Sequence, residues 1–184
     1  MTTSRDDILA TALGEFARNG FIGTSLQSIA DAAGLAKSSV LYHFSSKEAL
    51  LEAALEPAYT ALGDLLARTP VVVSSELARH DFVRDFVDLL FDHHEAVHIF
   101  INQSRSLVDV PAMQKAQEVI DRMAALFDET DLTQEHRVRF GIALGGAAYL
   151  LVAGDEQIQR ESATVRPLLV NILTELLAPL PTKD

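Results

Sequence analysis

The chain has 184 residues, of which 48% are apolar and 22% charged, and its formal net charge is −11. This composition is typical of a globular protein and excludes an intrinsically disordered chain. The absence of cysteine excludes disulfide scaffolds, cysteine-ligated zinc, iron–sulfur clusters and thiol nucleophiles. We expect a reducing cytoplasm and no membrane association, because there is neither an apolar run long enough to span a bilayer nor a signal-like start.

Charge is distributed unevenly along the chain. Residues 1–50 carry four basic and five acidic side chains, whereas the remainder carries eleven basic and twenty-one acidic ones. Such an asymmetry indicates two parts with different partners. Together with the motif described below, it predicts a first domain at 1–51 and a second at 52–184.

Helical periodicity dominates the sequence, and the only strand-like run, 71–75, is too short to form a sheet. Asn19-Gly20 is expected to end the first helix, and Pro57 is expected to kink the fourth. The fifth and sixth helices are either separate or continuous. The predicted fold class is all-α, with helices at about 4–19, 25–33, 37–43, 46–68, 76–93, 94–108, 111–129, 133–153 and 162–178.

The most informative stretch is GFIGTSLQSIADAAGLAKSSVLYHFSSKEALL, residues 20–51. Thr24 or Ser25 is expected to cap a helix whose apolar residue Ile29 faces the core. Gly34 allows a left-handed backbone conformation in the turn after this helix. A second short helix then follows, pinned by apolar residues such as Val40. Its outward side chains are hydrogen-bond donors: Lys37, Ser38, Ser39, Tyr42 and His43. A short donor-bearing helix after a glycine-containing turn is the geometry of a major-groove reader.

This stretch closely resembles the TetR family of bacterial transcription regulators. The matching residues are Gly20-Phe21, Thr24-Ser25, Ile29-Ala30, Ala33-Gly34-Leu35, Leu41-Tyr42-His43-Phe44 and Lys47-Glu48-Ala49-Leu50. With the first helix, the resemblance covers about residues 4–51, and the rest agrees only in length, helical content and helix order. The resemblance implies a helix-turn-helix DNA-binding domain followed by a helical bundle for ligand binding and dimerisation.

The resemblance also implies contacts to a double-stranded DNA operator. The implied contacts are Thr24 or Ser25 to a phosphate, Lys37, Ser38 and Ser39 to base edges or nearby phosphates, Tyr42 and His43 to backbone phosphates, and Lys47 to a further phosphate. The contacts of residues 37–39, 42, 43 and 47 have structural alternatives. Tyr42 can pack on the fourth helix, His43 can be a cap or be solvated, Lys47 can be a surface lysine, and residues 37–39 can be an inert helix start.

The last two predicted helices carry more apolar surface than one core needs, which indicates association. Gly141, Gly145 and Gly146 would let a neighbouring helix approach closely. The resemblance implies a homodimer through a four-helix bundle formed by these two helices from each subunit. Its two reading helices would lie about 34–36 Å apart on a near-palindromic operator. The alternative is that both helices are buried within the monomer.

The resemblance further implies a ligand cavity among the fourth to eighth helices. Such cavities are mostly apolar with a few oriented polar groups, so we expect a small, largely apolar or amphipathic effector. The alternative is an interior that side chains fill completely. No cofactor is predicted. The candidate effector contacts are Tyr59, Phe86, His94, His98, Asn102, Gln103, Met123, Phe127 and Tyr149.

His94 and His98 are four residues apart, a spacing that metal ligands use on one helix face. Asp92, Glu95 or His80 would complete such a site. However, acidic residues here are equally consistent with a solvated face. We therefore predict no metal site, and we treat the pair as an open alternative.

The leading interpretation is a ligand-responsive transcription regulator, in this family most often a repressor. Effector binding would move the fourth helix, which joins the two domains, and change the separation of the two reading helices. The alternative is a helical small-molecule-binding or scaffolding protein with a vestigial DNA-binding module. An enzyme is not predicted, because there is no glycine-rich phosphate loop after a strand, no GxSxG and no paired acid–base motif.

Overall fold

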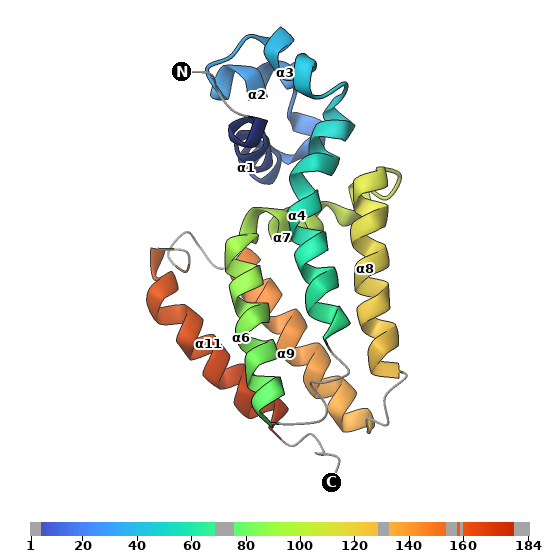
Figure 1. Cartoon of the computed structure of the whole chain (residues 1–184), viewed down its shortest axis with the longest axis vertical. Helices are drawn as coiled ribbons and strands as arrows, with labels where there is room; N and C mark the ends of the chain where they lie inside the picture. The colour runs from blue at the N-terminus through green and yellow to red at the C-terminus, as the bar shows by residue number, and fades with distance from the viewer. Residues whose placement is uncertain (1–4, 69–75, 129–132, 154–157, 159, 179–184) are drawn as a thin grey trace. The chain divides into compact units, whose positions relative to one another are not determined.

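A computed structural model describes residues 5–68, 76–128, 133–153, 158 and 160–178, with the side chains of 124 and 126–128 excepted. Every regular element within these ranges is helical, which confirms the predicted all-α class (Figure 1). In this part of the chain, no helix is both long and apolar enough to cross a membrane. The elements are α1 (Arg5–Gly23), α2 (Leu26–Ala32), α3 (Lys37–His43), α4 (Lys47–Ala67), α6 (Glu76–Asp92), α7 (His94–Gln103), the 3-10 turn η1 (Ser104–Ser106), α8 (Pro111–Asp128), α9 (Gln134–Ala153) and α11 (Ser162–Leu177).

The helix boundaries follow the sequence signals closely. The first helix is interrupted at Gly20, whose φ of 72° is non-helical, and residues 21–23 form a further turn beyond it. Helices α6 and α7 are separate, with a turn at His93 between them. Pro57 lies inside α4 and is exposed.

The chain folds into two compact units that do not follow chain order. The first unit contains residues 1–59 and 95–117, and the second contains residues 60–94 and 118–184. Helices α4 and α8 therefore each begin in the first unit and end in the second. The boundary predicted between residues 51 and 52 divides the chain by function, into DNA binding and effector binding, and it stays a prediction. The compact units divide the chain by packing, which assigns α7 and the start of α8 to the first unit.

The core of the first unit combines distant parts of the sequence. Phe16 of α1, Ile29 of α2 and Val40 of α3 are fully buried in one apolar cluster. Ile99 of α7 and Met113 of α8 lie in the same cluster. Burial of these side chains is the main favourable term for folding of the three N-terminal helices. The fold of these helices therefore depends on residues about 60 to 100 positions further along the chain.

The second unit is built on α6, α9 and α11, which pack against one another (Figure 1). The Arg166 guanidinium of α11 donates to Asp88 at 2.8 Å and to Asp92 at 2.7 Å, both on α6. It also lies over the Phe91 ring, 4.6 Å from the centroid. Because the start of α11 meets the end of α6, the two helices run antiparallel.

Gly34, in the turn between α2 and α3, has a φ of 68°, as the helix-turn-helix motif predicts. A Cβ there would meet no atom within 4 Å, so only the backbone conformation opposes a side chain. We expect Gly34→Ala to lower the free energy of unfolding by about 1–2 kcal/mol, the cost of a left-handed L-residue. Urea unfolding followed by circular dichroism measures this.

Gly23→Ala is the matched control for that substitution. Gly23 also has open space around it, but its φ is not positive. Its replacement is expected to leave stability unchanged or slightly raised, because alanine favours a helix. Equal losses for the two variants would contradict the backbone explanation.

Candidate nucleic-acid interface and effector residues

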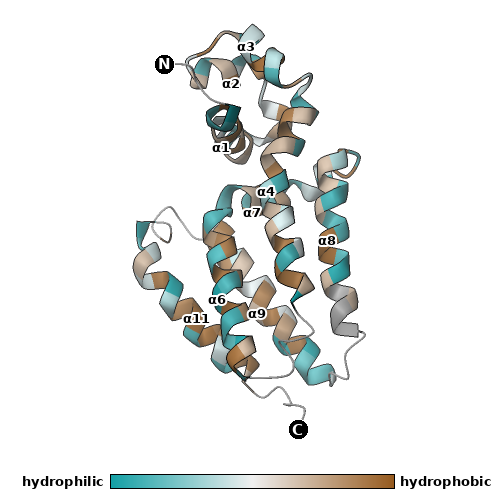
Figure 2. Cartoon of the chain, in the orientation of Figure 1, coloured by the Kyte–Doolittle hydropathy of each residue, from teal (hydrophilic) through white to brown (hydrophobic). Residues whose placement is uncertain are grey.

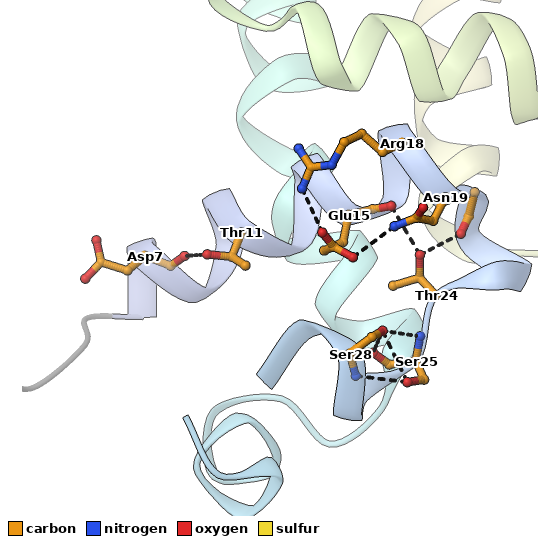
Figure 3. Close-up of polar contacts among 9 residues, drawn as sticks. Asp7, Thr11, Glu15, Arg18, Asn19, Thr24, Ser25 and Ser28 are labelled. Atoms are coloured by element: carbon orange, nitrogen blue, oxygen red, sulfur yellow. Dashed lines mark hydrogen bonds and ion pairs between the residues drawn. The ribbon is translucent and has the colours of Figure 1, made fainter. Parts of the chain in front are cut away.

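Ser25 caps the start of α2. Its Oγ accepts a hydrogen bond from the Ser28 N–H at 3.0 Å, and its own N–H donates to Ser28 Oγ at 3.0 Å, which forms a reciprocal capping box (Figure 3). The sequence left the cap open between Thr24 and Ser25, and the structure assigns it to Ser25. The Ser25 side chain is exposed at the amino end of a helix, where backbone N–H groups and the helix dipole favour an anion.

Thr24 lies on the inner side of the same turn. It is only 3% exposed, and its hydroxyl donates to the Gly20 carbonyl at 2.7 Å, with the Glu15 carbonyl at 3.2 Å (Figure 3). Thr24 thereby links the residues just before α2 to the backbone of α1 near its break at Gly20. Its phosphate contact stays a prediction, and of the two candidates only Ser25 has an accessible side chain.

Helix α3 has one buried and one exposed face. Val40 is fully buried, and Phe44, directly after the helix, is 4% exposed. These two residues hold the helix on the core of the first unit. Opposite them, Tyr42 is 86% exposed, which excludes its packing on the fourth helix. The other candidate contacts on α3 are the exposed Lys37, Ser38 and His43 and the half-buried Ser39.

Lys47 begins α4 and is directed back at the turn between α1 and α2. Its ammonium donates to the Phe21 carbonyl at 2.7 Å and to the Thr24 carbonyl at 2.9 Å. It also lies 4.2 Å from the centroid of the Phe21 ring. Lys47 is thus a structural link between α4 and the helix-turn-helix, a role that the sequence did not indicate. Its predicted phosphate contact would use the third ammonium hydrogen.

Gln103 of α7 occupies the break in α1. Its amide oxygen accepts from the Phe21 N–H at 2.9 Å, and its amide nitrogen donates to the Phe16 carbonyl at 2.8 Å. These two backbone groups flank Gly20, whose conformation interrupts the regular helical geometry. The side chain that the sequence assigned to an effector therefore satisfies the backbone of the DNA-binding helices. Its effector contact stays a prediction.

The other effector candidates divide between the two units. Tyr59, His98 and Asn102 belong to the first unit, and Asn102 Nδ2 lies 3.0 Å from His98 Nε2. Burial raises the pKa of the Tyr59 phenol, an effect that the nearby Lys115 opposes. The second unit contains the buried Phe86, the half-buried His94 and Met123, and the exposed Tyr149. The side chain of Phe127 lies outside the described residues.

The histidine pair shows no arrangement for a metal ion. His94 Nδ1 lies 3.3 Å from the Phe91 carbonyl oxygen, and His98 Nε2 faces Asn102. Within the described ranges, no three His, Asp or Glu side chains gather as a metal site requires. The residues present therefore give no support to the metal alternative.

Helices α9 and α11 both expose apolar side chains, and the ribbons of both helices carry hydrophobic residues, coloured brown in Figure 2. On α9, Ile142 is 60% and Tyr149 63% exposed, and Gly145 and Gly146 lie open between them. On α11, Leu168 is 55% exposed. The alternative that both helices are wholly buried in the monomer is therefore wrong. The exposed apolar stripes consist of Val138, Ile142, Tyr149 and Leu150 on α9 and Leu168 and Ile172 on α11.

A capped helix, a glycine turn and a second helix with exposed donors define a helix-turn-helix protein. The family profile described as bacterial regulatory proteins, tetR family, matches residues 8–54, which include all of these elements. Residues 8–54 therefore form a helix-turn-helix region of the TetR-family type.

Two curated relatives show how the similarity is distributed. The HTH-type transcriptional regulator RutR of Escherichia coli (strain K12) is 46% identical over 55 residues, which are 30% of this chain and 26% of RutR. The HTH-type transcriptional repressor KstR2 of Rhodococcus jostii (strain RHA1) is 31% identical over 108 residues, 56% of this chain and 52% of KstR2. The match thus spans about a quarter of the first relative and half of the second.

Two solved structures resemble the whole chain in fold. A TetR-family transcriptional regulator from Bordetella parapertussis 12822 is 19% identical, covers 97% of this chain and 96% of its own, and has a TM-score of 0.70. The transcriptional regulator FadR of Bacillus subtilis in complex with stearoyl-CoA is 16% identical, covers 97% of this chain and 100% of its own, and has a TM-score of 0.60. At these identities the likeness establishes the fold alone.

Proposed function

We propose that this protein is a ligand-responsive transcription regulator that binds double-stranded DNA through α3 and acts in the cytoplasm. The observation that carries the proposal is the face of α3, where Lys37, Ser38, Tyr42 and His43 are exposed while Val40 is buried behind them. These side chains donate hydrogen bonds to base edges and phosphates once the helix lies in a major groove. The relatives are named as transcriptional regulators, which agrees with this assignment.

The proposed DNA-binding form is a homodimer joined by the exposed apolar stripes of α9 and α11. A single α3 carries one lysine, so one copy alone has little electrostatic attraction for phosphate. Two copies related by a two-fold axis would place their reading helices about 34–36 Å apart, one turn of duplex, on a near-palindromic operator. The open space at Gly145 and Gly146 is compatible with close helix approach.

Repression relieved by a small amphipathic effector is the proposed mode of regulation. KstR2 is named a repressor, and FadR is described in complex with stearoyl-CoA, a ligand with an apolar chain. Helix α4 holds the DNA-binding turn through Lys47 at its first residue and ends in the second unit. Effector binding in the second unit would shift α4, with Pro57 a place for bending. By thermodynamic reciprocity, operator DNA then weakens effector binding by the same factor.

Fluorescence anisotropy with DNA fragments from beside the protein's own gene, at a fixed salt concentration, tests DNA binding. Tyr42→Phe removes only a phosphate-directed hydroxyl and is expected to weaken binding to every sequence about tenfold. Ser38→Ala and Ser39→Ala are expected to alter the preference among operator variants instead. Footprinting of the bound fragments then defines the operator.

Thr60→Ala is the control, because Thr60 is an exposed hydroxyl residue in the second unit. Its affinity for DNA should equal that of the wild type. If the wild type binds none of the fragments, the proposal fails, and the alternative of a small-molecule-binding protein with a vestigial DNA-binding module takes its place.

A further inference from the structure

Arg79 is a charged residue in the interior of the second unit. It lies on α6 and is only 4% exposed. Its neighbours on the same face of α6, Phe82, Val83 and Phe86, are buried apolar residues. Its Nη1 is fully buried and has no hydrogen-bond partner among the residues that the structure describes.

Such a guanidinium requires a partner. Arginine stays protonated in proteins, and an unpaired buried charge strongly disfavours the folded state. The aspartates of α6 do not supply the partner, because they pair with other arginines of the unit. These pairs are Arg84 with Asp81 and Asp85, Arg68 with Asp85, and Arg166 with Asp88 and Asp92. Glu76, the remaining acidic residue of α6, is exposed, and no ion pair between it and Arg79 is seen in the described part of the chain.

Helix α11, which packs against α6, also carries a buried polar group without a hydrogen-bond partner in the described ranges. This group is the hydroxyl of Thr174. The ion pair between Arg166 and Asp88 sets the register of the antiparallel helices. Measured from that pair, Arg79 and Thr174 both lie about 12–14 Å towards the same end of the unit, at 1.5 Å of helix rise per residue. The two unpaired groups therefore stand at nearly the same level of the helix pair.

We infer that Arg79 and Thr174 hold the oxyanion, a carboxylate or phosphate group, of an amphipathic effector. An oxyanion accepts hydrogen bonds from both the guanidinium and the hydroxyl, and it neutralises the buried charge. The apolar part of the ligand would pack on buried apolar side chains of the same two helices, such as Phe82, Phe86 and Leu173. This inference rests on the proposed function, since it specifies the chemistry of the effector.

Calorimetric titration and thermal melting of the full chain test the inference with three probes of equal chain length. The probes are octanoate, octyl phosphate and octan-1-ol. Octanoate, octyl phosphate or both are expected to bind and raise the melting temperature, and the neutral alcohol to do neither. A difference between the two anions identifies which oxyanion the site prefers.

Arg79→Met keeps the shape of the side chain and removes its charge. We expect it to weaken anion binding about 100-fold and, without ligand, to melt at or above the wild-type temperature, because an unpaired buried charge is gone. Arg68→Met, at an exposed arginine of the same unit, is the matched control and should bind the anions as the wild type does. Thr174→Val, a second and milder variant, should weaken binding about tenfold.

Two results would overturn the inference: no binding of either anion by the wild type, or equal anion affinity of the wild type, Arg79→Met and Thr174→Val. DNA binding by the wild type is measured on the same preparation. Loss of anion binding with intact DNA binding counts against the oxyanion site alone. Anion binding without DNA binding counts against the proposed regulator and leaves the site standing.

Discussion

Replacing Lys47 by methionine is expected to lower the free energy of unfolding by about 2–4 kcal/mol. The substitution keeps an aliphatic chain beside Phe21 but removes two charge-assisted hydrogen bonds, to the carbonyls of Phe21 and Thr24, together with the cation–π contact. Those carbonyls lie at the turn that sets α2 against α1. Urea unfolding followed by circular dichroism gives the change in stability, and anisotropy gives the affinity for DNA.

Lys37→Met provides the comparison, because Lys37 is exposed on α3. It should unfold like the wild type and yet bind DNA more weakly, with a smaller dependence on salt. Lys47→Met, in contrast, should have a lower free energy of unfolding than the wild type. If Lys47→Met unfolds like the wild type while its DNA affinity falls, Lys47 acts as the phosphate contact that the sequence predicted and its structural link is unimportant.

Ile142→Glu is expected to convert a dimer into a monomer. Ile142 is the most exposed aliphatic side chain on α9, and a carboxylate at the centre of an apolar interface would lose its hydration without a partner. We expect the dimer dissociation constant to rise about 100-fold or more. Sedimentation velocity would then show a 20.1 kDa species in place of one of twice that mass. Operator affinity should fall in parallel, since one copy carries a single reading helix.

Leu77→Glu is the control for this experiment. Leu77 is 73% exposed on α6 and does not belong to the stripes of α9 and α11. It should leave the mass and the operator affinity of the wild type unchanged. A wild-type protein that sediments as a monomer at micromolar concentration would contradict the proposed dimer.

Local signals in the sequence predicted the DNA-binding elements well. The turn glycine Gly34, the extents of α2 and α3 and the outward position of Tyr42 all depend on interactions within a few residues. Capping, glycine conformation and helical periodicity act at that range, so they can be seen without the fold. The same signals left the cap open between Thr24 and Ser25, because both residues are good caps and only burial distinguishes them.

The effector residues were harder to predict, since residue type does not reveal whether a polar group already has a partner. Gln103 is a polar residue in an apolar helix, which is typical of a ligand contact, but its amide is bonded to the backbone at the break in α1. Conversely, Arg79 gave no signal in the sequence, because the pattern around it also fits a surface arginine. Its burial and its lack of a partner in the described part of the chain depend on how α6 packs in the second unit.

Periodicity and short-range chemistry suffice to predict the all-α class, the helix-turn-helix and the excess of apolar residues on the last two helices. Three further features become visible only in the folded chain: α7 shares the core of the DNA-binding helices, Lys47 and Gln103 hold their backbone, and Arg79 is buried without a described partner. These features join residues far apart in the chain, and such pairings are set by packing, which no local pattern encodes.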